Sequence, residues 1–233
     1  MLTATDLAID ALGRCRLFSG LERSSMATLA HSLRTRRFRR GEVLFHQGDS
    51  GDALFILVAG AVKVVLPSEE GDEAILATLR PGDFLGELAL LDGAERSATA
   101  VALEPTETLV LPRARFRELV GREPAIRDAL LGAVAAELRR LTVQFGELHF
   151  LDLTGRLAAR LAWLAEDQGV RHVDGTIVLD APLTQSDLAA MIGATRQSVN
   201  KLLGLFVDDG LLRVERDSIV ILDQERLVRT SHR

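Results

Sequence analysis

Short apolar runs separated by glycine-containing turns fill the chain between residues 41 and 112. The turns include Gly48, Gly60 and Gly71, and glycine is favoured at such positions because it tolerates positive φ. The pattern predicts strands at residues 43–45, 54–58, 62–66, 74–77, 98–101 and 108–111. Many short strands at this spacing are typical of a barrel or a roll.

From residue 115 to about residue 150 the apolar positions recur with the period of a helix. One stripe steps by three and four residues and consists of Leu131, Val134, Leu138, Leu141, Phe145 and Leu148. Such a heptad seam suits a partner helix, whereas packing on the chain's own barrel explains so short a run equally well. A second apolar face, formed by Leu130, Ala133 and Ala136, is available to cover the barrel. Because this second face can cover the barrel, the heptad stripe is left free for a partner helix, which favours a dimer through that stripe.

The last third of the chain has the pattern of a small helical domain with a short sheet. A helix is expected over residues 157–164, capped by Asp152 and ended at Gly169. Two further amphipathic helices are predicted on either side of Gly193. Short strands are expected at residues 177–179, 211–214 and 219–222.

Composition limits the classes of protein to which the 233 residues can belong. Hydrophobic residues make up 47% of the chain, enough to bury a core, which excludes a disordered protein. Cys15 is the only cysteine, so an intrachain disulfide and a metal or iron–sulfur site built from several thiolates are excluded. No apolar run approaches the ~18 residues that cross a bilayer, and the first residues lack a secretion signal. We expect a cytoplasmic protein with no membrane partner and no metal.

The overall charge gives no general attraction to nucleic acid. The formal net charge is −5, and residues 155–233 hold ten Lys and Arg against eleven Asp and Glu. Any binding to double-stranded DNA must therefore depend on a few placed contacts, with a strong dependence on salt.

The densest chemical signal is a glycine turn followed by a predicted one-turn helix over residues 87–91. Gly86 lets the backbone turn sharply, and the free amides at the start of such a helix favour an anion. Arg96, nine residues after Glu87, supplies a cation that pairs with a phosphate, and Ser97 adds a hydroxyl. Glu87 fits beside an anion if its carboxylate accepts a hydrogen bond from a sugar hydroxyl. These groups together suit a cyclic nucleotide, and a surface ion pair beside a structural turn is the simpler alternative.

The helices around Gly193 form the second signal, because their spacing is that of a helix-turn-helix. Polar side chains at the start of the second helix are placed to reach base edges in a major groove, and the first helix is placed to contact phosphates. A plain helical hairpin has the same spacing, but the strands that follow look like a wing and favour DNA. The residues expected to contact DNA are Thr184, Gln185, Arg196, Gln197, Ser198 and Lys201.

The string Gly86-Glu87-Leu88-Ala89-Leu90, followed by Arg96-Ser97, resembles the phosphate-binding cassette of the cyclic AMP receptor protein and fumarate–nitrate regulator (CRP/FNR) family of bacterial transcription regulators. Residues 150–156 resemble that family's interdomain hinge. The resemblance runs from about residue 17 to residue 222 and implies an α+β fold. The domains it implies are an N-terminal double-stranded β-roll of the cyclic-nucleotide-binding type with N-terminal helices (1–113), a long dimerisation helix with a hinge (114–151) and a C-terminal winged helix-turn-helix (152–233).

The same resemblance assigns roles to individual residues. Gly86, Glu87 and Leu88 would contact ribose and phosphate, and Arg96 and Ser97 would hold the cyclic phosphate. Thr142 would offer its hydroxyl to the purine amino group across the dimer, while Leu141 replaces a second hydroxyl residue of the enteric protein. The base-reading positions are Arg196, Gln197 and Lys201. The implied effector is cyclic AMP or a related cyclic nucleotide, and the haem or iron–sulfur cluster of some relatives is not expected because the cysteines are missing.

A basic run over residues 34–40 is the third feature. Arg34 and Arg36, together with Arg115, align with the basic surface that the enteric activator presents to RNA polymerase. The predicted turn at His172 likewise resembles a polymerase-contacting loop. A solvated basic face is the simpler interpretation of the run.

The leading hypothesis is a homodimeric, ligand-gated transcription regulator that responds to a cyclic nucleotide, with cyclic AMP as the first candidate. One alternative keeps the DNA-binding fold but assigns another effector, such as a cyclic dinucleotide, or none. A second alternative is a regulatory subunit that uses the nucleotide domain to control an enzyme partner. An enzyme is not expected, because the sequence holds no nucleophile–base pair or metal cluster.

Overall fold

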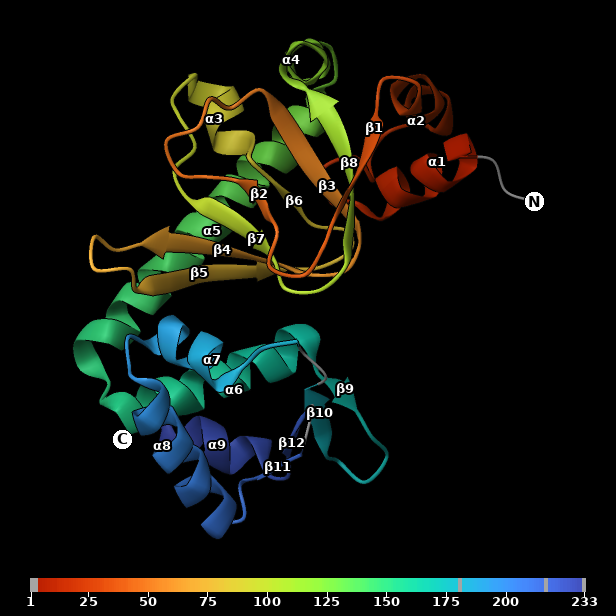
Figure 1. The fold of residues 1–233 in the computed structure, drawn as a ribbon. Helices are drawn as coiled ribbons and strands as arrows, with labels where there is room; N and C mark the ends of the chain where they lie inside the picture. Colours follow the sequence, from red (N-terminus) through yellow and green to blue (C-terminus); the bar gives the residue numbers. More distant parts are fainter. Residues whose placement is uncertain (1–3, 180–181, 216–217, 232–233) are drawn as a thin grey trace. The chain divides into compact units, whose positions relative to one another are not determined.

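A computed structural model describes residues 4–179, 182–215 and 218–231. The chain divides into two compact units, Met1–Leu138 and Arg139–Arg233, which are described separately. Figure 1 labels the elements of both.

The first unit is a β-roll preceded by two helices, α1 (Ala4–Arg14) and α2 (Arg23–Ala30). Its strands are β1 (Arg34–Phe38), β2 (Val43–Phe45), β3 (Ala53–Ala59), β4 (Val62–Pro67), β5 (Glu73–Leu79), β6 (Phe84–Leu85), β7 (Thr99–Ala102) and β8 (Thr106–Pro112). They pair antiparallel in two four-stranded sheets, ordered β1-β8-β3-β6 and β2-β7-β4-β5. The predicted roll is therefore confirmed, and each of the six expected strands is present.

Two apolar layers hold this unit together. Between the sheets, alternate residues of β3 and its neighbours form a core that includes Phe38, Phe55 and Val62. On the outer side of the β3 sheet, Leu54 and Ile56 pack with the helices around the roll. Figure 1 shows these helices, α1, α2 and α4, arranged about the sheet of β1, β8 and β3.

The helical stretch that the sequence predicts from residue 115 to residue 150 is two helices, α4 (Arg113–Arg122) and α5 (Pro124–Phe150). The break falls at Glu123, whose φ of −110° and ψ of 99° are extended. The cause is Pro124, because a proline restricts the residue before it to extended conformations and is itself favoured at the first position of a helix.

The two faces of α5 differ in burial, although the covered face ends earlier than expected. Leu130 is buried with the roll, but Ala133 is only half-buried and Ala136 is exposed. The prediction that Ala136 covers the barrel is therefore wrong, because only the first turns of α5 pack in the core. The heptad stripe is largely exposed, with 68% of Leu131 and 64% of Phe145 accessible.

The second unit contains the end of α5 and a small helical core closed by a sheet. Its other elements are α6 (Leu153–Gln168), β9 (Val170–Arg171), β10 (Ile177–Leu179), α7 (Gln185–Ile192), α8 (Arg196–Asp208), β11 (Leu212–Val214), β12 (Ile219–Ile221) and α9 (Gln224–Thr230). The sheet order is β11-β12-β10-β9. Its core is formed by buried side chains from α6, α7, α8 and α9, among them Leu161, Leu188, Val199 and Leu227, together with residues of the sheet. The predicted helix-turn-helix and wing strands are confirmed.

Candidate ligand-binding and DNA-binding sites

The candidate nucleotide site is built around α3 (Glu87–Asp92), the one-turn helix of the glycine motif. Gly86 precedes it with a φ of +86°, a conformation that a side chain strains. A Cβ at Gly86 would also overlap the Arg96 guanidinium, and a Cβ at Gly51 would overlap the Ala89 side chain. The sequence thus seats α3 directly against the backbone of the roll.

Arg96 is buried at the start of this helix, with only 4% of its surface exposed. Its Nη1 donates a hydrogen bond to the carbonyl oxygen of Gly86 and its Nη2 donates one to that of Ala53, each at 2.6 Å. The guanidinium carbon lies 4.4 Å from the ring centroid of Phe45 and 5.9 Å from that of Phe55. The arginine is therefore fixed by two backbone oxygens and two aromatic rings.

Glu87 lies half-buried on the first turn of α3. Burial raises the pKa of its carboxyl group, the charge of Glu137 raises it further, and the charge of Arg96 lowers it. Burial also lowers the pKa of the Arg96 guanidinium, while Asp52 and Glu87 raise it. Glu87 and Arg96 thus attract each other, but the hydrogen bonds of Arg96 go to carbonyl oxygens.

Arg113, which lies outside the sequence motif, also holds α3 against the roll. Arg113 donates from Nε to the carbonyl oxygen of Gly51 at 2.8 Å and from Nη2 to that of Ala89 at 3.1 Å. Neither Arg113 nor Phe45 belongs to the motif, and the contacts that make them relevant span tens of residues. These contacts follow from the pairing of distant strands, which the motif does not encode.

The other predicted ligand residues differ in setting. Leu88 is 42% exposed on α3, and Ser97 is exposed in the turn after Arg96. Thr142 is exposed on the part of α5 that belongs to the second unit.

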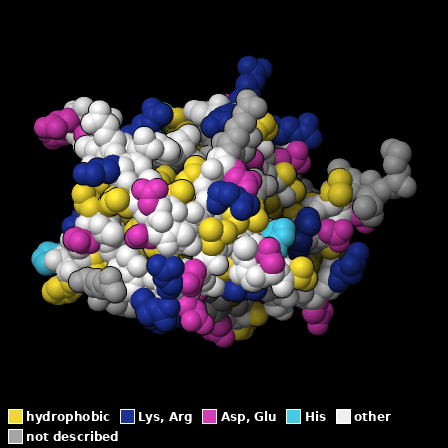
Figure 2. Space-filling model, turned by 90° about the horizontal axis from the view of Figure 1, so that it is seen from below, with side chains coloured by type: hydrophobic (Ala, Val, Ile, Leu, Met, Phe, Trp, Pro, Cys, Tyr) yellow, Lys and Arg dark blue, Asp and Glu magenta, His cyan; other side chains and the backbone are white. Residues whose placement is uncertain are grey.

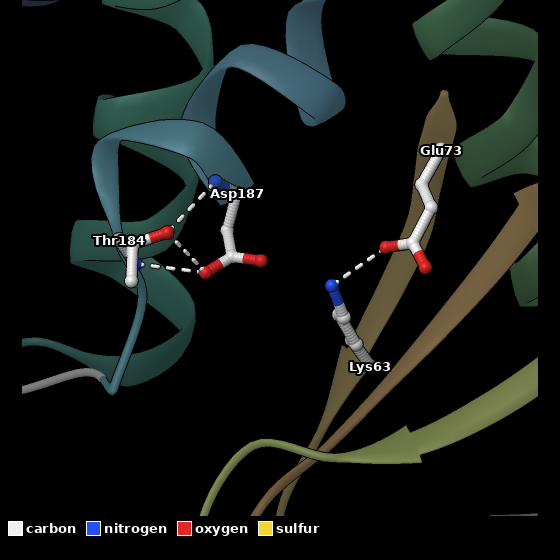
Figure 3. A network of polar contacts seen from close by, with 4 residues as sticks. All are labelled: Lys63, Glu73, Thr184 and Asp187. Atoms are coloured by element: carbon white, nitrogen blue, oxygen red, sulfur yellow. Dashed lines mark hydrogen bonds and ion pairs between the residues drawn. The ribbon is translucent and has the colours of Figure 1, made fainter. Parts of the chain in front are cut away.

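A capping box between Thr184 and Asp187 caps the N-terminus of α7, the first helix of the helix-turn-helix (Figure 3). The Thr184 hydroxyl accepts from the amide of Asp187 at 3.1 Å, and the Asp187 carboxylate accepts from the amide of Thr184 at 2.9 Å. The hydroxyl also donates to this carboxylate at 2.7 Å. Figure 3 additionally shows the ion pair between Lys63 and Glu73 across the β4–β5 hairpin, at 2.7 Å.

The recognition helix α8 starts at Arg196 after the N-cap Thr195, whose hydroxyl accepts from the amide of Ser198 at 3.1 Å. Arg196, Gln197 and Lys201 are exposed. The Ser198 hydroxyl lies 2.9 Å from that of Thr195, which gives it a partner within the helix start. The exposed residues in the first two turns of α8 thus include long polar side chains, as the sequence predicts.

Gln185 lies at the start of α7 and is half-buried. Its Nε2 lies 3.5 Å from Oδ1 of Asn200 on α8. Figure 2 shows Lys and Arg side chains interspersed with Asp and Glu over the face drawn, in keeping with the balanced charge of the sequence.

The residues aligned with a polymerase-contacting surface have these positions. Arg34 and Arg36 are exposed on β1, the edge strand of its sheet. Arg115 is half-buried on α4 and donates from Nε to Oγ of Ser32, which precedes β1, at 3.2 Å. His172 is exposed in the second unit, after β9.

Two features are absent from the part of the chain that the structure describes. Within residues 4–179, 182–215 and 218–231, no helix combines the length and apolar character that a bilayer crossing requires. In the same ranges, no group of three His, Cys, Asp or Glu side chains is placed to hold a metal ion.

Comparison with known proteins agrees with this geometry. Residues 35–123 match the cyclic nucleotide-binding domain, and residues 155–230 match the Crp-like helix-turn-helix domain. A CRP-like cAMP-activated global transcriptional regulator of Mycobacterium tuberculosis is 34% identical over 220 residues, which cover 94% of this chain and 98% of that protein. The chain belongs to the CRP/FNR family of transcription regulators.

Further CRP/FNR relatives extend the match. The cAMP-activated global transcriptional regulator CRP of Salmonella typhimurium is 34% identical over 180 residues, 76% of this chain and 84% of that protein. A solved CRP/FNR-family regulator from Thermus thermophilus superposes with a TM-score of 0.67 at 30% identity, covering 86% of this chain and 99% of that one. This CRP/FNR protein is accordingly a ligand-gated, DNA-binding transcription regulator with a cyclic nucleotide-binding domain.

Proposed function

We propose that the protein is a homodimeric, cytoplasmic regulator that binds cyclic AMP in the β-roll and, in response, binds double-stranded DNA through α8. The observation that supports this most directly is the buried cation of Arg96 at the start of α3. A fixed guanidinium beside the first amides of a helix suits a cyclic phosphate, which carries one negative charge. The related M. tuberculosis protein is described as cAMP-activated.

In this proposal the ligand completes a site whose donors are not all used. Nε of Arg96 is a buried donor with no acceptor among the described residues, so a phosphate oxygen supplies what the protein does not. Gly86 and Leu88 border the phosphate, Ser97 adds a hydroxyl donor, and the Glu87 carboxylate accepts from the ribose hydroxyl. Since a carboxylate beside a phosphate is unfavourable, its partial compensation by the charge of Arg96 matters.

Gating follows from a ligand that contacts the roll and α5 together. Thr142 is proposed to meet the purine amino group from the partner subunit. The exposed stripe of α5, which includes Leu131, Leu138 and Phe145, is proposed as the dimer seam. A nucleotide that binds one packing of this seam better than another shifts the population toward it. That packing then sets the two recognition helices ~34 Å apart, one turn of DNA.

On DNA, Arg196, Gln197 and Lys201 are proposed to read base edges in the major groove, with Ser198 beside them. Thr184 and Gln185 at the start of α7 are proposed to contact phosphates. Each bidentate contact to a base contributes about 1–3 kcal/mol of discrimination, so Arg196→Ala is expected to weaken binding by roughly 5- to 150-fold for each half-site of the operator. Binding to unrelated DNA should change far less.

The deciding experiment is calorimetry with cyclic AMP and cyclic GMP on the full chain. Wild-type protein should bind cyclic AMP, and Arg96→Gln should lose this binding. Arg37→Gln is the matched control, because Arg37 is an exposed arginine paired with Glu107 on the same roll. Absence of heat with wild type, or equal heat with Arg96→Gln, would refute the site.

A second experiment measures operator binding by the same protein with and without cyclic AMP. Operator binding that cyclic AMP strengthens supports the proposal. An operator affinity that does not change when cyclic AMP is added would favour another effector, such as a cyclic dinucleotide, or none. Failure to select any DNA sequence, despite nucleotide binding, would favour a regulatory subunit that controls a protein partner.

RNA polymerase is proposed as a further partner, contacted by Arg34, Arg36 and Arg115 and by the turn at His172. Reversal of the three arginine charges should reduce activated transcription while leaving DNA binding intact. Unchanged activated transcription in that variant would contradict the proposed contact with RNA polymerase.

A further inference from the structure

The second unit holds a cavity of about 240 Å³ between the end of α5 and α6. Its lining residues from α5 are Arg139, Arg140, Val143, Gln144 and Glu147, and those from α6 are Arg160 and Trp163. None of the α5 residues belongs to the heptad stripe itself, although Gln144 flanks it. The cavity also shares no residue with the nucleotide or DNA sites described above.

Arg160 lines the cavity and is 7% exposed. Its Nη2 lies 3.6 Å from Oε2 of Glu147, which is longer than a hydrogen bond, and its Nε has no acceptor among the described residues. The guanidinium carbon lies 5.5 Å from the ring centroid of Trp163. A buried arginine with an unused donor is costly unless an acceptor arrives.

The neighbouring side chains show where such an acceptor would be held. In the amide orientation that satisfies both of its ends, the Gln144 oxygen accepts from Arg160 Nη1 at 3.0 Å, from Arg160 Nη2 at 3.2 Å and from Arg140 Nη1 at 2.7 Å. Two guanidinium groups thus converge on one neutral oxygen. Arg139 also lines the cavity, and Glu147 supplies the carboxylate of the lining. Burial lowers the pKa of the Arg160 guanidinium, the charge of Glu147 raises it, and the charge of Arg140 lowers it.

We propose that this cavity binds a small organic anion, whose carboxylate or phosphate group replaces the Gln144 oxygen between Arg140 and Arg160 and whose flat apolar body contacts Trp163. Carboxylate and phosphate share the planar or forked oxygen pattern that guanidinium groups recognise. The Trp163 ring and Val143 supply an apolar wall, which favours an anion with a hydrocarbon or aromatic part over a bare ion. Because the lining comes from both helices, a bound anion would bridge α5 and α6 and stabilise their joint.

Trp163 makes the proposal directly measurable, because it is the only tryptophan in the chain and there is no tyrosine. The probes are benzoate and phenyl phosphate, which present one flat body with either anionic group, and acetate and inorganic phosphate, which lack the body. Sodium chloride keeps the ionic strength constant. We expect a saturable change in Trp163 emission with benzoate or phenyl phosphate, and a weaker effect of acetate and phosphate. Which of the two aromatic probes binds more tightly distinguishes a carboxylate from a phosphate ligand.

Two variants test the assignment of the site. Arg160→Met should weaken the response at least tenfold, whereas Arg117→Met, which removes an exposed arginine of α4, should leave it unchanged. Gln144→Glu keeps all the arginines and places a carboxylate where the anion is proposed to sit. It should raise the melting temperature and abolish the probe response, and it decides the matter if Arg160→Met does not fold.

A linear response, no response, or a titration of Gln144→Glu equal to that of wild type would overturn the proposal. Arg96→Gln should still respond to the probes, because Arg96 belongs to the other unit. Failure of the cyclic AMP site and failure of this cavity are therefore separate results.

Discussion

Nη1 of Arg96 lies 2.6 Å from the carbonyl oxygen of Gly86, the residue that turns the chain into α3. The cation proposed to bind the phosphate is therefore also the residue that fixes the entrance to the helix offering its amides. Ligand binding and the local backbone conformation are joined in one contact, and substitutions there should affect both.

Gly86→Ala is predicted to abolish cyclic AMP binding and to destabilise the roll. Both Gly86 and Gly93, at the two ends of α3, have positive φ, and a side chain in that conformation costs roughly 1–3 kcal/mol. Only at Gly86 would the added Cβ overlap Arg96, since nothing lies within 4 Å of a Cβ at Gly93. Gly93→Ala should thus lower stability in urea unfolding but retain nucleotide affinity in calorimetry. Equal affinity in the two variants would contradict the role of the Gly86–Arg96 contact.

Phe45→Leu is predicted to weaken cyclic AMP binding by about 2- to 30-fold, which corresponds to the ~0.5–2 kcal/mol of a guanidinium–ring contact. The reason is that Phe45 carries the ring nearest to the Arg96 guanidinium, at 4.4 Å. Phe45→Tyr keeps the ring and should restore affinity. Phe38→Leu is the control, since Phe38 packs on Phe55, 6.4 Å between centroids, in the same core. The prediction fails if the Phe38 and Phe45 variants lose affinity to the same extent.

Thr184→Ala is predicted to lower the stability of the second unit by about 0.5–2 kcal/mol, the usual cost of losing an N-cap side chain. The hydroxyl of Thr184 caps α7 and bonds the buried carboxylate of Asp187. Thr184→Ser retains the hydroxyl and should recover most of the stability, and Ser186→Ala, at an exposed neighbour, should change little. Thermal unfolding followed by circular dichroism measures all three. A Thr184→Ser variant as unstable as Thr184→Ala would show that the hydroxyl is not responsible.

Cys15 is predicted to make stability depend on pH in the alkaline range. Burial raises the pKa of its thiol to about 11 from the ordinary value of 9.0, so the folded state favours the neutral thiol. This contribution is fully present below pH 9 and is lost as the pH rises toward 11, by about 1.4 kcal/mol for each unit. Urea unfolding of wild type and of Cys15→Ala between pH 8 and pH 11 should show the wild type losing more stability. An equal loss of unfolding free energy in wild type and Cys15→Ala over this pH range would contradict the prediction.

The positions of the strands and of the one-turn helix could be predicted because glycine and the apolar pattern act locally. Gly86 at a φ of +86° is such a case, since its residue type and its backbone conformation are directly linked. The break before Pro124 was equally local, but the helical period on either side of it concealed the interruption.

Contacts between distant parts of the chain could not be read in this way. Strand β1, Arg34–Phe38, has no alternation of apolar and polar residues, and it is a strand because its backbone pairs with β8. The partners of Arg96 include Ala53, 43 residues earlier, and Phe45. The motif predicts which cation is present, but the pairing of β2, β3 and α3 decides what surrounds it.

The arginines of β1 also bear on self-association of the protein at high concentration. An edge strand offers unpaired amide and carbonyl groups along its outer side, and a second molecule can add a strand there. Arg34, Arg36 and Arg37 are exposed along that edge, so an approaching copy meets like charges that repel it and side chains that must give up their hydration. The charge on β1 therefore disfavours the addition of a strand from a second molecule at this edge of the sheet.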